Sequence, residues 1–165
     1  MPVAFVSARR YAHPMATVAL ASDHAGFALK QALVDWLRAE GHAPHDLGPA
    51  NDESVDYPDF GYRLAREVGE GRADFGVAVC GTGIGISIAV NRHRLARCAL
   101  VHDHLSARLA REHNDANVIA LGARLIGVET ARDAVAVFLR TPFGGDRHAP
   151  RVAKLAEPPL QELTA

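Results

Sequence analysis

Two short segments of this chain combine glycines with side chains that can bind a ligand or move a proton. The first is Ser22-Asp23-His24-Ala25-Gly26, and the second is Cys80-Gly81-Thr82-Gly83-Ile84-Gly85. Three glycines at alternate positions leave the second turn almost without Cβ atoms, so its backbone N–H groups can converge on an anion. The same glycines are equally typical of a tight turn that needs positive φ. Their spacing and their place after the third predicted strand argue against a dinucleotide-binding loop.

The cysteine at the start of the second segment is a candidate for chemistry. Cys80 comes directly before the glycine turn, where the N-terminus of a following helix would stabilise a thiolate. This position favours a reactive thiol over a structural one. Cys98 lies inside an apolar stretch and is expected to be a buried structural residue. Because no second cysteine is close to Cys80 in sequence, a thiol redox function is the weaker hypothesis.

Polar residues at two further positions have both structural and functional interpretations. Asp23 could contact a ligand or simply cap the next helix. His24 has no evident capping or core role, which favours contact with a polar ligand. The segment His113-Asn114-Asp115 fits a turn as well as it fits a binding site.

The C-terminal part of the chain carries a cationic cluster after Gly144-Gly145. Arg147 and Arg151 are four residues apart and would share a helical face, where with His148 they could hold a phosphate. A solvent-exposed charged face is the usual alternative, but the preceding glycines favour a placed anion site. The segment His102-Asp103-His104 contains residue types that bind zinc. No further ligand lies at the spacing of a zinc site, so no metal is expected.

Composition limits the classes of function. The chain has 165 residues, 48% hydrophobic and 22% charged, with a net charge of −1, which is typical of one globular domain and gives no basic excess for nucleic acid. No run approaches the roughly 18 apolar residues of a membrane span. Two cysteines in apolar stretches fit a reducing cytoplasm. Residues 1–15 are expected to be a disordered extension, or to precede the true start at Met15, and residues 158–165 to be flexible.

Between these ends, residues 16–157 are predicted to form a single domain in which strands and helices alternate. This pattern predicts a three-layer α/β/α Rossmann-like sandwich with a five-stranded parallel sheet and a C-terminal tail helix. The expected strands are Thr17–Ser22, His45–Leu47, Phe75–Cys80, Arg97–Val101 and Val118–Leu121. The expected helices are Phe27–Ala39, Asp59–Val68, Gly83–Asn91, Leu105–Arg111, Val128–Leu139 and, in the tail, Arg147–Leu155. Ligands of such sheets bind beyond the carboxyl ends of the strands, where Asp23 and Cys80 are expected.

Five motifs in this order resemble the ribose-5-phosphate isomerase B family, whose wider group includes galactose-6-phosphate isomerase. They are Asp23-His24-Ala25-Gly26, Asp56-Tyr57-Pro58, Cys80–Gly85, His113–Asn117, and Gly144-Gly145 with Arg147, His148 and Arg151. The similarity runs from about Thr17 to Leu155. It implies interconversion of ribose 5-phosphate and ribulose 5-phosphate, a step of the pentose phosphate pathway, through a cis-enediol without metal or cofactor.

The resemblance also implies a role for each matching residue. Cys80 would be the general base, His113 would open the sugar ring, and Thr82 would lie beside the reacting oxygens. The sugar-contacting positions would be Asp23, His24, Tyr57, Asn114, and the turn residues Gly81, Gly83, Ile84 and Gly85, whose amides would stabilise the enediolate. The phosphate-side positions would be Arg124, Arg147, His148 and Arg151.

Topology raises a difficulty that predicts an assembly. The segment before the fifth strand lies at the amino edge of a parallel sheet, whereas Cys80 ends a strand at the carboxyl edge. His113 and Asn114 are therefore expected to come from a second subunit, in a homodimer with shared sites or a tetramer. The alternatives to ribose 5-phosphate are allose, galactose or tetrose phosphates, and a non-catalytic sugar-phosphate-binding protein.

Overall fold

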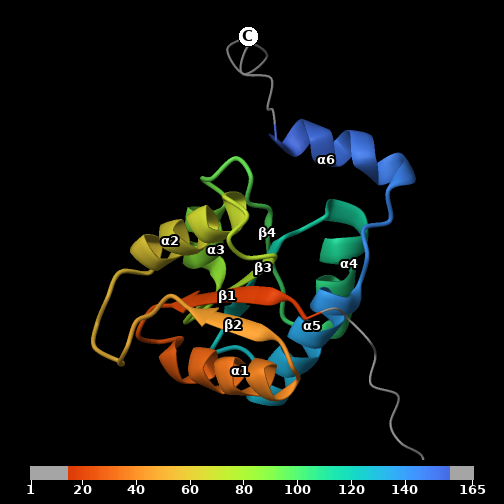
Figure 1. Ribbon diagram of the computed structural model, residues 1–165. Helices are drawn as coiled ribbons and strands as arrows, with labels where there is room; N and C mark the ends of the chain where they lie inside the picture. The colour runs from red at the N-terminus through yellow and green to blue at the C-terminus, as the bar shows by residue number, and fades with distance from the viewer. Residues whose placement is uncertain (1–14, 157–165) are drawn as a thin grey trace, which may run out of the picture.

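Five short runs of mainly small and β-branched residues form a parallel sheet in the computed structural model, which describes residues 15–156 (Figure 1). The strands are β1 (Thr17–Ser22), β2 (Ala43–Asp46), β3 (Phe75–Cys80), β4 (Cys98–Leu100) and β5 (Val118–Gly122). All neighbours pair in parallel, in the order β2-β1-β3-β5-β4. The predictions for residues 1–14 and 158–165 lie outside the described residues.

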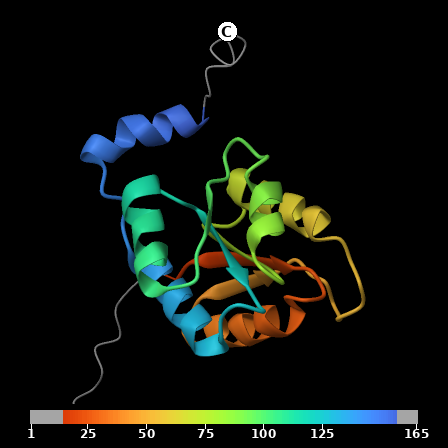
Figure 2. The same ribbon diagram turned by 180° about the vertical axis from the view of Figure 1, so that it is seen from behind.

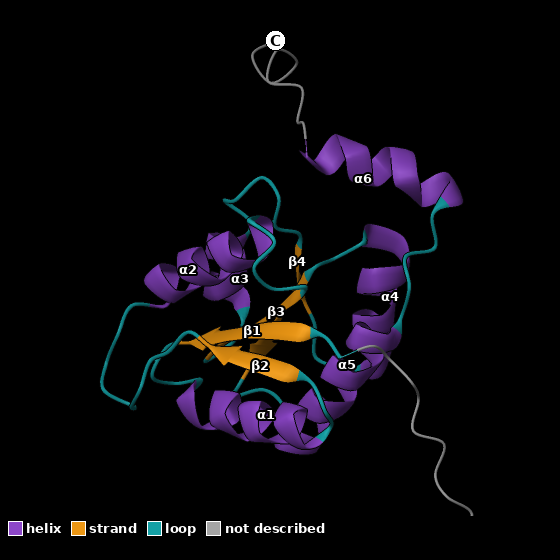
Figure 3. Cartoon of the chain, in the orientation of Figure 1, coloured by secondary structure: helices purple, strands orange, loops and turns teal. Residues whose placement is uncertain are grey.

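Helices cover both faces of this sheet, which confirms the predicted three layers (Figure 3). They are α1 (Phe27–Ala39), α2 (Tyr57–Gly69), α3 (Ile84–Val90), α4 (His104–Asn114), α5 (Val128–Arg140), the 3₁₀ turn η1 (Asp146–His148) and α6 (Ala149–Ala156). Alternate residues of each strand face opposite layers. Val18 and Leu20 of β1 pack with α1 and α5, whereas Ala19 and Ala21 pack with α2 and α3.

Three predicted elements, β1, β3 and α1, have the expected bounds, and others differ for local reasons. β2 begins at Ala43, two residues before the expected start, because it is an edge strand and tolerates Pro44. α2 begins at Tyr57, so that Pro58 occupies its first turn. α4 continues to Asn114, past the expected end at Arg111, because Asp115 ends it in the left-handed conformation.

The expected tail helix is divided into two elements. Arg147 and His148 belong to η1, and the α-helix begins only at Ala149. Proline has no backbone N–H and fits the first turn of a helix, so Pro150 favours this later start. The predicted arrangement of Arg147 and Arg151 on one continuous α-helix is therefore wrong. α6 buries none of its residues and projects from the rest of the chain (Figure 2).

The strand order places the two glycine-containing segments next to each other. From β1 the chain moves outward to β2 and then returns to β3 on the other side of β1, so the order reverses between β1 and β3. Ser22 pairs with Val79 at the carboxyl ends of these strands, directly before Asp23 and Cys80. This reversal point is where open α/β sheets bind ligands. Within residues 15–156, no helix has the length and apolar character needed to cross a membrane.

Candidate active site

Cys80 ends β3 and lies against the turn that begins α3. Its Sγ accepts a hydrogen bond from the Gly83 N–H at 3.1 Å. The hydroxyl of Thr82 accepts the N–H of Ile84 at 3.3 Å. Cys80 is only 4% exposed, because strand alternation directs its side chain into the layer of α2 and α3. The sulfur predicted to be reactive is therefore nearly enclosed within one chain.

Gly83 shows that part of the glycine turn is required by the backbone. Its φ is +77°, and a Cβ atom there would lie 2.6 Å from Cδ1 of Leu100 and 2.9 Å from the carbonyl carbon of Leu121. Any larger residue would clash with both neighbours and adopt a disfavoured conformation. The interpretation of Gly83 as a turn glycine is thus correct, and the same turn directs an N–H at the Cys80 sulfur.

The first segment packs beside this turn. Oδ1 of Asp23 accepts the N–H of Gly26 at 2.9 Å, which closes the turn before α1; Gly26 is itself the N-cap of the helix, so the interpretation of Asp23 as the helix cap is wrong. Nδ1 of His24 lies 3.3 Å from both the N and the O of Val55, in the loop before α2. His24 is therefore held by the backbone of a neighbouring loop.

Two side chains from other elements cover the glycine turn. The Tyr57 ring occupies the space next to Gly85, where a Cβ atom would lie 2.6 Å from Cζ of the ring. The Arg124 guanidinium lies over Gly81, where a Cβ atom would be 3.3–3.4 Å from its atoms. The backbone N–H of Arg124 donates to the Gly81 carbonyl at 3.0 Å. The carboxyl edge of one chain thus brings together Asp23, His24, Tyr57, Cys80, the turn 81–85 and Arg124. We call this set the sugar half of the site.

The other predicted residues gather at the opposite end of the molecule. The imidazoles of His113 and His148 stack, with ring centroids 4.3 Å apart. The Gly144 N–H donates to the Glu112 carbonyl at 2.8 Å and fastens the tail to the end of α4. Desolvation and the positive charges of His113, Arg147 and Arg151 lower the pKa of His148, against a smaller opposing effect of Glu112. We call His113, Asn114, Arg147, His148 and Arg151 the tail half of the site.

A single chain does not join these two halves. Cys80 ends β3, whereas His113 and Asn114 lie in the last turn of α4, which returns to the edge where the strands begin. A six-residue strand such as β3 is about 20 Å long. This geometry agrees with the separation expected from the order of elements. It also divides the four predicted phosphate-side residues, since Arg124 is with Cys80 and the other three are with His113.

Some residues of the predicted motifs have structural roles. Asp115 adopts φ +45° after α4 and accepts hydrogen bonds from Arg111 at 2.8 Å and Arg97 at 2.9 Å. Asp103 caps α4 by accepting the Ser106 N–H at 2.8 Å, and the Ser106 bonds lower the pKa of Asp103. His104 contacts Asp133 at 3.0 Å. In the described part of the chain, no group of three His, Cys, Asp or Glu residues is placed to hold a metal.

The two cysteines differ in their surroundings, and both are free thiols. Burial raises the pKa of Cys98 to about 12, which makes this thiol a poor nucleophile at neutral pH. Cys98 is only partly buried, and not fully buried as expected, but its raised thiol pKa fits a structural role. Its backbone N–H bonds the side chain of Asn91 at 2.8 Å.

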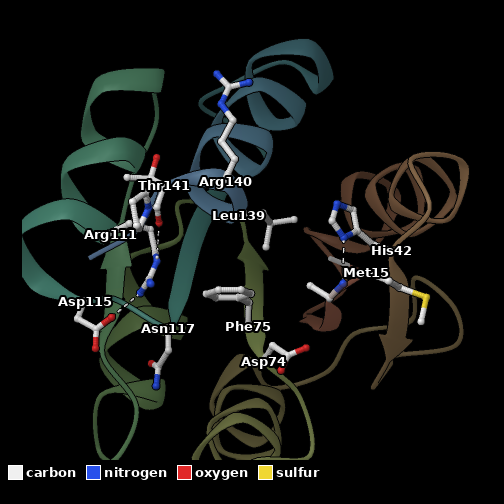
Figure 4. Close-up of a pocket in the computed structure, with 12 residues that line it drawn as sticks. Met15, His42, Asp74, Phe75, Arg111, Asp115, Asn117, Leu139, Arg140 and Thr141 are labelled. Atoms are coloured by element: carbon white, nitrogen blue, oxygen red, sulfur yellow. Dashed lines mark hydrogen bonds and ion pairs between the residues drawn. The ribbon is translucent and has the colours of Figure 1, made fainter. Parts of the chain in front are cut away.

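A cavity of about 660 Å³ lies away from the sugar half, at the edge where β1, β3 and β5 begin (Figure 4). Its lining includes Met15, Asp74, Phe75, Arg111 and Thr141 but none of the predicted site residues. The Arg111 guanidinium donates to Asp115, to the Ala116 carbonyl and to the Thr141 carbonyl, and it lies 5.2 Å from the centre of the Phe75 ring. Arg111 therefore already has internal partners, and the cavity is not the candidate active site.

One buried cation near the sugar half was missed by the sequence analysis. Lys30 is fully buried in α1 and pairs with Asp46 at the end of β2. Its spacing from Leu33, Val34 and Leu37 puts it on the apolar face of the helix. A charged residue at such a position is a signal that a buried partner must exist.

Comparison with known proteins identifies the family. The sequence model described as ribose/galactose isomerase matches residues 18–155, which is most of the chain. The chain belongs to this family. Its members are aldose–ketose isomerases, so the glycine turn and Cys80 lie in an enzyme, and the alternative of a non-catalytic binding protein is excluded.

Individual relatives of this isomerase have different named substrates. It is 40% identical over 138 residues to ribose-5-phosphate isomerase B of Escherichia coli, covering 84% of this chain and 93% of that protein. It is 38% identical over 143 residues to D-erythrulose-4-phosphate isomerase of Pectobacterium atrosepticum, covering 86% and 93%. The structure of ribose-5-phosphate isomerase B from Clostridium thermocellum is similar with a TM-score of 0.85 and 43% identity, covering 90% of this chain and 99% of that one.

Proposed function

We propose that this isomerase interconverts D-ribose 5-phosphate and D-ribulose 5-phosphate, with Cys80 as the general base. The observation that carries this proposal is the Cys80 Sγ at the reversal point of the sheet, 3.1 Å from the Gly83 amide. A hydrogen bond from an N–H stabilises sulfur as a thiolate, the form that accepts a proton. The relative in Escherichia coli supports the choice of substrate.

The reaction moves one hydrogen between adjacent carbons. The Cys80 thiolate takes the proton from C2 of the open-chain aldose, and the electron pair shifts to the C1 oxygen to form an enediolate. Amides of the turn 81–85 stabilise this negative charge, an effect that can contribute a factor of about 10²–10³ per donor. The Cys80 thiol then returns the proton to C1, while the O2 proton passes to O1 beside the Thr82 hydroxyl.

Binding residues hold the rest of the substrate. In this proposal Asp23, His24 and Tyr57 contact the sugar, and Arg124 approaches the phosphate. Cys80 is 4% exposed, so in this proposal the substrate reaches it when the Tyr57 and Arg124 side chains over the neighbouring turn move aside; Tyr57 is itself 40% exposed. Binding energy from the phosphate positions C1 and C2 against the sulfur.

A second subunit completes the site. The partner's His113 opens the sugar ring, the partner's Asn114 binds a hydroxyl, and the partner's tail arginines and His148 hold the phosphate. This homodimer has two shared sites, and two such dimers can form a tetramer. The unpartnered α6 supports the proposal, because a helix with no buried residue in one chain has its apolar side chains available to another. The free cysteines fit the cytoplasm as the compartment.

A substrate panel tests the proposed activity. We would measure kcat/KM for the phosphates of ribose, allose, galactose and erythrulose, with a metal chelator present throughout. We expect ribose 5-phosphate to have the highest kcat/KM. The relative in Pectobacterium atrosepticum makes D-erythrulose 4-phosphate the second candidate. A clear preference for that tetrose, or for a hexose phosphate, would replace the proposed substrate.

A further inference from the structure

Lys30 is among the largest fully buried side chains in the described part of the molecule, and it is charged. Its Nζ lies 2.6 Å and 2.7 Å from the two carboxylate oxygens of Asp46, whose side chain is 30% exposed. A buried ion pair adds little net stability compared with well-packed apolar residues, but it can specify one arrangement of the chain.

The pair fixes the start of the loop that follows β2. Oδ1 of Asp46 also accepts the Gly48 N–H at 2.9 Å, and the Gly48 carbonyl accepts the Ser22 N–H at 3.1 Å. Ser22 is the last residue of β1, directly before Asp23. Lys30 therefore holds the loop, through Asp46 and Gly48, against the strand end that carries Asp23.

The backbone of Lys30 reaches the same segment from the other side. Its N–H donates to the Gly26 carbonyl at 2.9 Å, and the Gly26 N–H donates to Asp23 Oδ1 at 2.9 Å. A Cβ atom at Gly26 would lie 2.6 Å from the Val79 carbonyl oxygen, so this turn packs directly on β3, one residue before Cys80. The first turn of α1, the end of β1 and the end of β3 are thus held as one unit.

The far end of the loop meets His24. Val55 contacts Nδ1 of His24 at 3.3 Å, and α2 begins two residues later with Tyr57. The loop 47–56 is therefore anchored at its start by the Lys30–Asp46 pair and at its end by His24. Movement at the first anchor would displace His24 and Tyr57 together.

We propose that Lys30, acting through Asp46, is a positioning residue for Asp23, His24 and Tyr57. This inference rests on the proposed function, because it assumes that these three residues contact the substrate. Lys30 does not take part in the chemistry itself, since its ammonium group is enclosed and bonded to Asp46. Its role is to place the sugar half of the site.

Enzyme kinetics separate positioning from a purely structural role. Lys30→Met should raise KM for ribose 5-phosphate by about tenfold, and Asp46→Asn should raise it by about threefold. Both variants should keep kcat within about threefold of the wild-type value, because the contacts that are lost bind the ground state. Asparagine retains an acceptor for Gly48, which is why its effect should be smaller. The matched control is Leu37→Ala, fully buried at the other end of α1, which should lower the melting temperature without changing KM. Asp46→Asn keeps the test valid even if Lys30→Met does not fold.

Hydrogen exchange gives a readout that does not depend on activity. In Lys30→Met and Asp46→Asn, the amides of Ser22, Gly48 and Val55 should exchange faster than in Leu37→Ala at matched stability. Exchange and KM values equal to those of the control would overturn the positioning role. A wild-type enzyme that converts no sugar phosphate would instead defeat the proposed function, and the exchange rates would still decide whether the pair holds the loop.

Discussion

The imidazole of His113, at the end of α4, lies parallel to that of His148, in the tail, with an angle of 13° between the rings. This stack fastens two segments that both carry predicted site residues and that both lie far from Cys80. It makes the tail half of the site a preformed unit, which the proposed dimer requires.

The stack predicts a pH dependence. We expect His148 to titrate below its ordinary value of about 6.5, because desolvation and the nearby positive charges of His113, Arg147 and Arg151 disfavour its protonation. With the folded-state pKa lowered, this group's contribution to stability is present above the unfolded value and is lost as pH falls.

An NMR titration of the histidine rings checks this prediction. In His113→Gln the pKa of His148 should rise but stay below the ordinary value, because desolvation is the largest cause. The tail should also become more mobile in acid. A His148 that titrates at or above about 6.5 would show that the stack has no such effect.

A pair of glycine variants tests the geometry of the glycine turn between β3 and α3. Gly83→Ala should destabilise the chain by about 2–4 kcal/mol, since it adds both a left-handed alanine and an overpacked contact with Leu100. Gly127→Ala is the matched control, because a Cβ there meets no atom within 4 Å, and it should change stability by less than about 1 kcal/mol. Equal melting temperatures for the two variants would be inconsistent with this structure.

Asp115 provides a test of the segment that presents His113. Asp115→Ala removes the partner of Arg97 and Arg111 and should cost about 2–3 kcal/mol in the free energy of unfolding. Asp115→Asn keeps an acceptor and tolerates the left-handed conformation, so it should cost clearly less. Chemical denaturation measures both. Two variants as stable as the wild type would mean that these ion pairs are unimportant.

The shared site predicts that inactive chains rescue each other. Cys80→Ala and His113→Ala should each be inactive, but a mixed dimer would contain one site with both residues intact. Random mixing makes half of the dimers mixed, and one site in each is complete, so about a quarter of wild-type activity should return. Exchange of subunits must be shown by mass spectrometry. Mixed dimers without activity would mean that one subunit supplies both His113 and Cys80, which contradicts the shared site.

Local sequence signals predicted most of the fold. The apolar spacing of α1 and its ending near Gly41 were sufficient for its bounds, and the buried runs of β1 and β3 were equally clear. The end of α4 was not predictable, because Asp115 stops the helix with help from Arg97, on a distant loop. The start of α6 could have been predicted from Pro150, whose place in a first turn is a general rule.

The site was predictable at the level of strand ends and not at the level of side chains. Strand order brings Asp23 beside Cys80, and chain direction separates both from His113. The packing of Tyr57 and Arg124 over the glycine turn depends on contacts between distant elements, which no local pattern contains.

The most direct test of Cys80 as the general base is the activity of Cys80→Ala with ribose 5-phosphate, measured beside Cys98→Ala as the matched cysteine control. Removal of a general base should lower kcat by about 10²–10⁴-fold and should abolish exchange of the transferred hydrogen with deuterated water. Cys98→Ala should keep wild-type kcat, because desolvation raises the pKa of the Cys98 thiol to about 12. A folded Cys80→Ala enzyme that isomerises ribose 5-phosphate at the wild-type rate would show that Cys80 is not the general base.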